Sequence, residues 1–380
     1  MRDDFEEKLK QYMEGTLNPE EKEEVERELD RLEKYQEWIE REVDDSREIP
    51  RKNVLEDKKY RKALIKGKWK ARFHNALTAL AILIVITVIS SIVSSFYYLS
   101  GTPPRIERYR EIVQFSIATT YPNARMEGSG MEVRPFFTTG IKGNLQKRIG
   151  DREKKIGDIE GSFLFNALSI EPIKLYSDDD HPLISFDPSE ERYVSQWERL
   201  EKIPEGTVAE AFVVFDRAYP TEEALKKFLG KNLQLLWLGV DIKRPDGDVF
   251  AQPIGFPHHP MWLEEDYRLE SKEVEKGFLG SKATTELKSA PNIDDYGDGK
   301  LRNENFLRVL KYLQKYPKIS QRVAPFTMHN LDEIISYVQK NGVKIYGMVV
   351  TGPSKEILKL KEEDWVRGVT VGEVDFWNMD

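Results

Sequence analysis

Cysteine is absent from the 380-residue sequence. Its absence excludes disulfide bonds, thiolate zinc sites and cysteine nucleophiles. Disulfides are common in eukaryotic secreted domains, so an exported domain without cysteine fits a bacterial surface better. Several catalytic signatures are also missing, among them Gly-x-Ser-x-Gly, His-Glu-x-x-His, the Walker loop and the Rossmann glycine pattern. No paired-carboxylate site stands out either. The sequence therefore predicts no enzyme, no cofactor and no metal centre.

Charge is missing from one long segment. Charged residues make up 33% of the chain, yet none lies within the 24 residues from Ala76 to Leu99. About 20 apolar residues in a helix suffice to cross a bilayer core. A buried core helix is rarely apolar on every side over this length, and a signal peptide has a shorter apolar core near the N-terminus. Because interfacial aromatic residues also flank the run, we predict a single transmembrane helix over 76–99.

The two flanks of this apolar run differ in charge. Residues 58–75 contain eight lysines and arginines and no acid, whereas the arginines after the run alternate with Glu107 and Glu111. The positive-inside rule therefore predicts a cytoplasmic N-terminus and an extracytoplasmic C-terminal domain in the cell membrane. The basic stretch resembles a nucleic-acid-binding segment in composition. Beside a membrane helix it is better explained as a topology determinant that touches anionic lipid, with no direct nucleic-acid contact.

The segment 1–57 is acidic, with 21 acidic and 11 basic residues. Leu9 and Tyr12 lie on one face of a first helix that starts at Asp3 or Asp4 and ends near Gly15. Asn18, followed by Pro19, is typical of the N-cap of a second helix that reaches about Asp44. The apolar stripe of this second helix consists of Val25, Leu29, Leu32, Ile39 and Val43, with Tyr35 and Trp38 beside it.

Two such helices bury too little apolar surface to sustain a core of their own. The pair therefore either dimerises or lays its apolar stripe on a partner, as amphipathic helices do in hydrophobic grooves. An amphipathic spacer or a coiled coil is the alternative. The acidic surface favours a basic partner, such as a DNA-binding protein whose nucleic-acid surface becomes covered.

Two segments carry a resemblance to a known family. Residues 9–21 and 25–29 resemble the opening of bacterial anti-sigma domains, in which Leu-x-x-Tyr-x-x-Gly-x-Leu precedes an acidic helix start. Many of those domains bind zinc through one His and two Cys, which segment 1–57 lacks, so the resemblance is to the zinc-free form. Residues 197–215 resemble the C-terminal domain of the membrane-bound sigma-factor-regulator family. The most similar type that we identify is the anti-sigma factor of the extracytoplasmic-function sigma factor M class.

This resemblance implies a mechanism. The cytoplasmic helices would wrap an extracytoplasmic-function sigma factor, block its docking on core RNA polymerase, its promoter contacts or both, and release it on envelope stress. The resemblance carries over six sigma-factor contacts, which are Leu9, Tyr12, Leu17, Val25, Leu29 and Leu32. A membrane partner protein or an extracytoplasmic ligand is left open as the source of the signal.

Two other classes of protein stay open. A membrane-anchored surface enzyme or envelope-binding protein would need a catalytic or binding constellation outside the membrane, and we find none. A signalling receptor with a cytoplasmic partner unrelated to transcription is compatible with the same architecture.

The region beyond Gly101 predicts an α+β domain with a largely antiparallel sheet, because helices and strands mix without a βαβ repeat. We divide it into a linker or base region, 100–160, and a regulator domain, 161–380. In the base region we expect extended pieces at Ile112–Ala118 and Met131–Phe137. In the regulator domain we expect strands at Thr207–Phe215, Leu233–Ile242, Val343–Val350 and Val366–Trp377, a turn at Arg244–Asp248, and helices at Glu222–Leu229 after a Thr221 cap, at Asn303–Tyr316, and from an Asn330 cap to Lys340.

Three polar clusters in this domain do not amount to a site. Asp178–His181 is typical of a solvated loop. Asn292–Asn305 departs from a calcium loop at the third position, Tyr296, and at the twelfth, Asn305. The adjacent pair His258–His259 lacks the spacing of metal-binding histidines, and a rigid exposed loop is the simpler interpretation.

Overall fold

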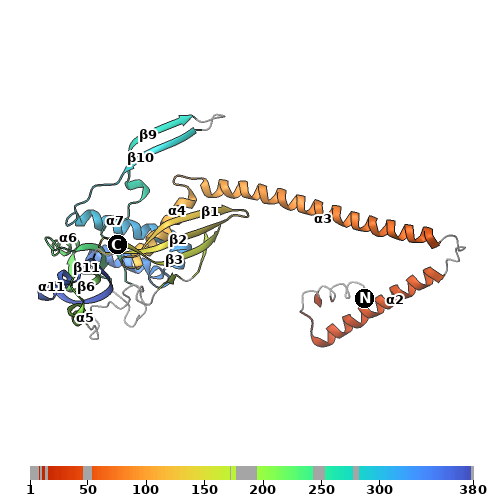
Figure 1. The fold of residues 1–380 in the computed structure, drawn as a ribbon, viewed down its shortest axis with the longest axis horizontal. Helices are drawn as coiled ribbons and strands as arrows, with labels where there is room; N and C mark the ends of the chain where they lie inside the picture. The colour runs from red at the N-terminus through yellow and green to blue at the C-terminus, as the bar shows by residue number, and fades with distance from the viewer. Residues whose placement is uncertain are drawn as a thin grey trace. The chain divides into compact units, whose positions relative to one another are not determined.

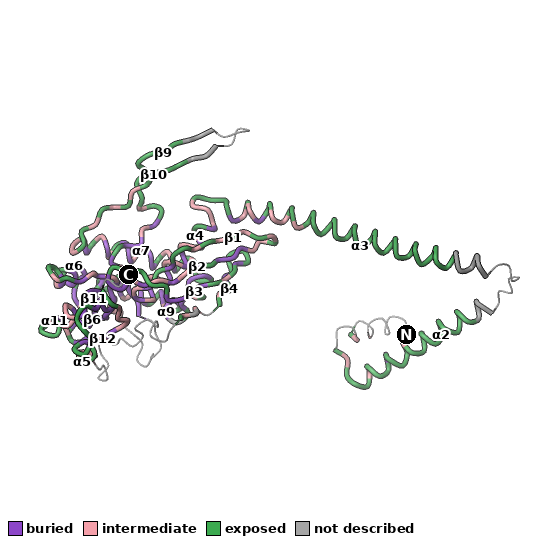
Figure 2. Tube along the Cα trace, in the orientation of Figure 1, coloured by how far each residue is buried: buried purple, intermediate pink, exposed green. Residues whose placement is uncertain are grey.

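The computed structural model describes residues 8, 11–12, 16–45, 54–171, 173–176, 195–242, 253–276 and 282–377. The chain forms two compact units, Met1–Ala81 and Ile82–Asp380. The expected turn at Arg244–Asp248 and the acidic run Asp178–His181 lie outside the described residues, as do most residues of the expected first helix. Figure 2 shows that buried residues gather in the C-terminal unit, whereas the helices of the N-terminal unit are mostly exposed.

The N-terminal unit contains helix α2, Pro19–Asp45. The predicted cap is confirmed, since the side-chain oxygen Oδ1 of Asn18 accepts a hydrogen bond of 2.9 Å from the backbone N–H of Glu21. Lys8, which precedes the helix, forms an ion pair of 3.0 Å with Glu24. The hydroxyl of Tyr12 donates a hydrogen bond of 3.1 Å to Glu26. Lys8 and Tyr12 therefore lie beside the first turns of α2.

Helix α3 spans Val54–Leu99 and passes through both units (Figure 1). Its part from Tyr60 to Leu99 is long and apolar enough to cross a membrane. The helix begins well before the apolar run, so the basic residues 58–75 are helical too. Two of its hydroxyl side chains bond to the helix backbone, since Thr87 donates to the carbonyl of Leu83 and Ser91 to that of Thr87, both at 2.8 Å.

The first sheet of the C-terminal unit is antiparallel and lies beside helix α4, Arg105–Thr120 (Figure 1). Its strands follow one another along the chain in the order β1–β2–β3–β4, and β5 pairs with β3. Their bounds are β1 Arg125–Arg134, β2 Thr138–Ile149, β3 Arg152–Leu164, β4 Ala167–Ile170 and β5 Lys174–Leu175. Strand β3 crosses residue 160, where the sequence analysis placed a boundary.

Two expectations for this region need correction. Ile112–Ala118 is helical, since α4 buries residues at the spacing of a helix face, namely Tyr109, Ile112, Val113, Ser116, Ile117 and Thr120. Met131–Phe137 is a strand only as far as Arg134, because residues 135–137 form the turn to β2.

The second sheet has the order β12–β6–β11–β7–β8, and every strand pair that the structure describes is antiparallel. The predicted α+β class and the four strands are confirmed, with shifted ends. Their bounds are β6 Thr207–Pro220, β7 Gln234–Val240, β8 Gly255–Pro257, β11 Lys344–Pro353 and β12 Val366–Phe376. The inner strand β6 is buried along most of its length, as expected for a strand covered on both faces.

The remaining helices pack on the second sheet, on one another or, in the case of Pro317–Val323, on α4 and β4, and the expected helices are found. Their bounds are α5 Trp197–Lys202, α6 Thr221–Lys226, α7 Gly299–Gln314, α8 Pro317–Val323, α9 Pro325–His329, α10 Leu331–Asn341 and α11 Ser354–Lys359, with 3₁₀ turns at Glu264–Asp266 and Leu360–Glu362. A separate hairpin pairs β9, Arg268–Lys276, with β10, Lys282–Ser289.

The expected caps at Thr221 and Asn330 are wrong in detail. Thr221 is already the first helical residue of α6, and its hydroxyl donates to Oδ1 of Asn303 at 2.6 Å. Asn330 occupies the cap position of α10, but its side chain makes no capping hydrogen bond. Both helices are held by packing, with Leu225 and Val338 among their buried residues.

The two sheets meet around a buried lysine. Lys147 of β2 lies 3.4 Å from a carboxylate oxygen of Glu210 on β6 and 2.9 Å from one of Glu373 on β12. Asn123 also donates to Glu210 at 2.7 Å. Burial alone would raise the pKa of Glu373, but the hydrogen bonds and charges of Lys154 and Lys147 outweigh it, so that pKa lies below its usual value. The first sheet is thus joined to the second by charge-assisted bonds.

Candidate functional site

The apolar stripe of α2 is divided into two halves. In the first half Val25 is only 1% exposed and Leu29 is half-buried. In the second half the side chains are between 43% and 62% exposed, and these are Leu32, Tyr35, Trp38 and Ile39. The rings of Tyr35 and Trp38 lie 5.9 Å apart. The second half is therefore a bare apolar surface, which we call the α2 stripe.

The structure separates the six predicted contact residues. Val25 is buried where Lys8 and Tyr12 lie against the helix, and Tyr12, Leu17 and Leu29 are half-buried. Leu32 is exposed, and Leu9 lies outside the described residues. The sequence pattern identified one continuous face, but it did not show that part of that face is already buried at Val25.

Acidic side chains surround the α2 stripe. The basic residues of α2 have acidic neighbours one turn away, as in Lys22–Glu26 at 3.8 Å, Arg31–Glu28 at 3.5 Å and Arg41–Glu37 at 3.7 Å. Such exposed pairs add little stability. Acids outnumber bases in the segment, so much of its negative charge is left for a basic partner.

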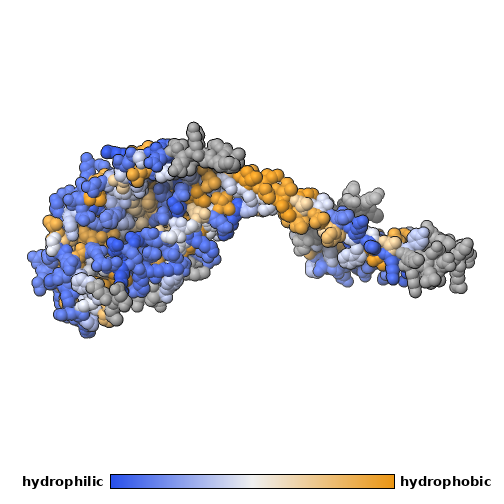
Figure 3. Space-filling view, turned by 45° about the horizontal axis from the view of Figure 1, so that its top comes forward, coloured by the Kyte–Doolittle hydropathy of each residue, from blue (hydrophilic) through white to orange (hydrophobic). Residues whose placement is uncertain are grey.

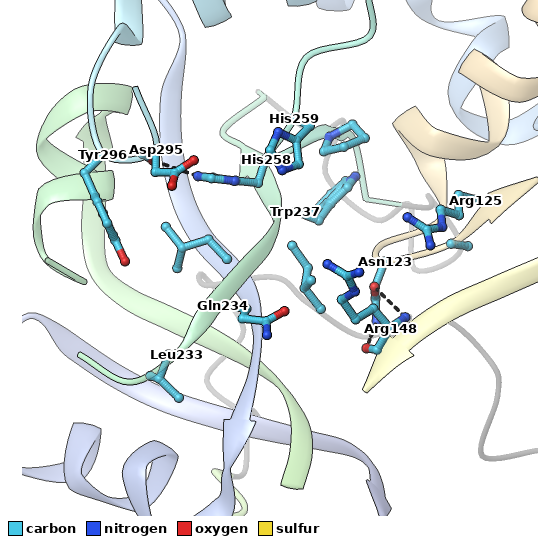
Figure 4. A pocket seen from close by; sticks show the side chains of 14 residues that line it. Asn123, Arg125, Arg148, Leu233, Gln234, Trp237, His258, His259, Asp295 and Tyr296 are labelled. Carbon is cyan, nitrogen blue, oxygen red and sulfur yellow. Dashed lines mark hydrogen bonds between the residues drawn. The ribbon is translucent and has the colours of Figure 1, made fainter. Parts of the chain in front are cut away.

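A cavity of about 440 Å³ lies in the C-terminal unit, between the first sheet and the β7–β8 edge of the second (Figure 4). Trp237 and His258 line one side, and Arg125 and Arg148 the other. Both arginines are paired with Glu153, at 2.5 and 2.8 Å. Arg125 also lies 3.6 Å from a carboxylate oxygen of Glu127. Two carboxylates thus offset the two cations, so the cavity carries no clear preference for an anionic ligand.

Arg302 of α7 holds the loops beside this cavity in place and is 1% exposed. Its guanidinium donates to the carbonyl of His258, to that of Asp294 at 2.7 Å and to that of Gly297 at 3.1 Å. Burial lowers its pKa. This clamp joins two segments that sequence analysis considered separately, the histidine pair and the acidic loop 292–305.

The acidic side chains of loop 292–305 accept hydrogen bonds from the backbone of the same loop. Asp298 accepts a hydrogen bond from the N–H of Asp294 at 2.8 Å, and Asp294 accepts one from the N–H of Tyr296 at 2.8 Å. Among the residues that the structure describes, no group of three or more His, Asp or Glu side chains is placed to hold a metal. The loop is therefore a structural turn that the Arg302 clamp fixes.

His258 and His259 differ sharply in environment. His258 is buried, and its Nε2 lies 2.7 Å from the carbonyl of Asp295, to which it donates as the neutral tautomer. Burial lowers its pKa to about 4, although the bond to Asp295 opposes the shift. His259 is exposed. The expectation of an exposed loop is therefore correct for His259 and wrong for His258.

Comparison with known proteins identifies the class. A model of the sigma factor regulator N-terminal domain matches residues 61–154, and a model of the sigma factor regulator C-terminal domain matches residues 200–373. The chain belongs to the sigma factor regulators, a family of anti-sigma factors that act by regulation rather than catalysis. Neither matched range includes α2.

A particular relative extends the likeness to the whole chain. The "Probable anti-sigma-M factor YhdL" of Bacillus subtilis (strain 168) is 28% identical to this protein over 389 aligned positions, which cover 100% of this chain and 99% of the relative. The resemblance inferred from residues 9–29 and 197–215 is thus confirmed at the level of the family. No solved structure matches the chain.

Proposed function

We propose that this anti-sigma factor spans the cell membrane once, holds an extracytoplasmic-function sigma factor on its cytoplasmic N-terminal unit, and releases it on envelope stress. The observation that carries the proposal is the α2 stripe, an apolar surface on an acidic helix. A surface of this kind is stable in the cell when a partner covers it. Sigma factors bind DNA and carry basic surfaces, so an acidic helix with an apolar face suits them.

Within this proposal the predicted contacts take two roles. Tyr12 bonds to Glu26 beside the buried Val25, and Leu9 precedes Tyr12 in the sequence. Leu17 and Leu29 lie at the margin of the covered half. Leu32 begins the surface that the sigma factor buries, together with Tyr35, Trp38 and Ile39. Aromatic side chains such as Trp38 and Tyr35 are the commonest energetic anchors of protein interfaces.

A paired substitution tests the interface. Trp38→Glu places a carboxylate in the α2 stripe, and burying an unpaired charge costs several kcal/mol. Lys34→Gln changes the net charge by the same amount one helical turn away, about 40° around the helix from Trp38, and leaves every apolar side chain of the stripe in place. With full-length protein in detergent and the small sigma factors of the same cell, we expect one sigma factor to co-purify at one to one. Trp38→Glu should weaken its binding by more than about thirtyfold, the effect of a hot spot of about 2 kcal/mol.

The Lys34→Gln variant is the control, and it should bind the sigma factor as tightly as the unaltered chain does. Equal binding by the Trp38→Glu and Lys34→Gln variants would remove the α2 stripe from the interface. Failure of every sigma factor to co-purify, with the protein intact, would favour the alternative of a signalling receptor whose cytoplasmic partner is unrelated to transcription.

The orientation of the chain in the membrane can be tested separately, because the absence of cysteine allows a single labelled cysteine to be introduced. Tyr60 and Phe376 are both well exposed and lie on opposite sides of the apolar run. In whole cells we expect a membrane-impermeant maleimide to label a Phe376→Cys variant at once, and a Tyr60→Cys variant only after the membrane is opened. The reverse pattern would show that the basic flank of α3 does not set the topology.

A further inference from the structure

A ladder of hydrogen bonds joins the apolar helix α3 to the first sheet. Ser90, Ser94 and Tyr98 lie four residues apart, on one side of α3. The hydroxyls of Ser90 and Ser94 accept the backbone N–H groups of Phe136 and Phe137, at 2.6 and 2.8 Å. The hydroxyl of Tyr98 donates to the carbonyl of Phe137 at 2.7 Å. The β1–β2 turn, Pro135–Phe137, is therefore fixed along the last turns of α3.

The β3–β4 turn, Phe165–Asn166, joins the same ladder. The backbone N–H of Phe165 donates to the carbonyl of Phe137 at 3.0 Å, and the Tyr98 hydroxyl lies 3.3 Å from the carbonyl of Phe165. The rings of Phe137 and Phe165 stack at 4.6 Å, and the ring of Tyr97 meets both edge-on. The two turns and the end of α3 thus form one packed cluster.

Large apolar side chains stand exposed at these turns. Phe136, Leu164 and Phe165 are between 43% and 54% exposed. Phe136 and Phe165 also have positive φ values, 60° and 53°, which bulky residues rarely adopt. The surrounding hydrogen bonds hold this costly backbone, so the exposure of these rings is a built feature. In Figure 3 the apolar surface of the helix continues onto the neighbouring edge of the C-terminal unit.

The position of Ser90 in the helix places the β1–β2 turn close to the bilayer. The last charged residue before the apolar run is Arg72, and no other follows before Arg105. A span of about 20 residues that begins directly after Arg72 ends near Ile92, and one that begins at Ala76 ends near Ser95. Ser90 lies within the span in both cases. A backbone N–H at this depth needs a partner, and the Ser90 hydroxyl supplies one to Phe136.

We propose that the β1–β2 and β3–β4 turns insert Phe136, Leu164 and Phe165 into the membrane leaflet on the C-terminal side. The occupant of this surface is lipid, because the surface is continuous with the lipid-facing side of α3. Phe and Leu are among the side chains that interfacial segments bury at the boundary between headgroups and acyl chains. The insertion ties the first sheet to the bilayer at both turns, so a change in lipid packing or thickness acts directly on the C-terminal unit. The proposal rests on α3 spanning the membrane and is independent of sigma-factor binding.

Lipid-borne quenchers test this inference on the full-length chain. Phe136→Cys, Leu164→Cys and Phe376→Cys variants are labelled with an environment-sensitive fluorophore and reconstituted into vesicles of phosphatidylcholine and phosphatidylglycerol. Phe376 is a matched control, since it is 55% exposed and lies on the edge strand β12 of the second sheet. We expect the labels at 136 and 164 to emit further to the blue and to lose most of their fluorescence to doxyl lipids, whereas iodide in the buffer quenches only the label at 376.

The Leu164→Cys variant keeps the test valid if the Phe136→Cys variant fails to fold. Leu164 ends a regular strand, and its backbone has no positive φ. Quenching of the labels at 136 and 164 by iodide, as at 376, would overturn the proposal. Blue-shifted emission without quenching by doxyl lipid would also overturn it, by showing that protein rather than lipid covers the turns. Co-purification of a sigma factor with the same variants separates either result from a failure of the proposed function.

Discussion

Replacing Lys147 by methionine is expected to lower the free energy of unfolding of the C-terminal unit by about 3–5 kcal/mol at pH 7, because it removes the buried cation between Glu210, which loses its charged partner, and Glu373, which keeps Lys154. The side chains of Lys147 and Glu210 are 5% and 7% exposed, so water cannot replace the lost partner. Urea unfolding of the full-length protein in detergent, followed by tryptophan fluorescence, measures the difference.

A second methionine variant on the same strand is the control. Lys142 also forms an ion pair, 2.7 Å from Glu160, but both side chains are mostly exposed. An exposed pair contributes about 0–1 kcal/mol, so Lys142→Met should change stability little. Equal effects of the two substitutions would show that the lysine between the sheets contributes no more than a surface charge.

The loss caused by Lys147→Met should shrink in acid. In the unaltered protein the pKa of Glu373 is held below its unfolded value, so its contribution is present at neutral pH and is lost as the pH falls through the folded pKa. In the variant Glu373 keeps Lys154 but loses Lys147, so its pKa rises and acid relieves part of the penalty. Adding Glu373→Gln to Lys147→Met should therefore restore part of the stability at pH 7, as expected for residues that interact directly.

The sequence predicts those parts of the fold whose pattern and packing agree. Strands β6 and β11 are recognisable from apolar runs of β-branched residues bounded by turn signals, and α7 and α10 from apolar residues at helical spacing. Their ends differ by a few residues, because β6 continues as a paired strand to Pro220 although its outward residues there are polar.

Helix α4 shows where local propensity fails. Ile112, Val113 and Ile117 favour a strand, and this preference led to the expectation of an extended piece. The same residues recur at intervals of one helical turn and are fully buried in the structure. Burial of a whole helix face outweighs the small propensity cost of each β-branched residue.

Some parts of the candidate sites could likewise be predicted from the sequence, and others could not. The α2 stripe could be found from spacing alone, since it depends on one helix. The Arg302 clamp and Lys147 could not, because their partners are backbone carbonyls or residues far along the chain. The hydrogen bonds of α3 left a trace in the sequence, because Ser90 and Ser94 are polar residues at helical spacing inside an apolar run. Only the structure shows that they bind the β1–β2 turn.

Acid is expected to destabilise the C-terminal unit through His258 as the pH falls from about 6.5 to about 4. The unfolded histidine binds a proton below its ordinary pKa of 6.5, whereas burial keeps the folded residue neutral until about pH 4. Protons therefore favour the unfolded state throughout this window. A pKa difference of this size corresponds to about 3 kcal/mol, which is fully lost below the folded pKa. Arg302 and His259 both oppose a charge on His258, and Asp295 favours it.

Two glutamine variants isolate this group. His258→Gln keeps an N–H donor for the carbonyl of Asp295 but does not titrate, and His259→Gln removes the exposed neighbour. Urea unfolding at pH 6.5, 5.5 and 5.0 avoids most of the titration of Glu373, whose pKa lies below 4.5. We expect the unaltered chain and His259→Gln to lose about 2 kcal/mol between the ends of this range, and His258→Gln to lose far less. Parallel profiles for all three proteins would mean that His258 is protonated in the folded state, which its burial beside the Arg302 guanidinium opposes.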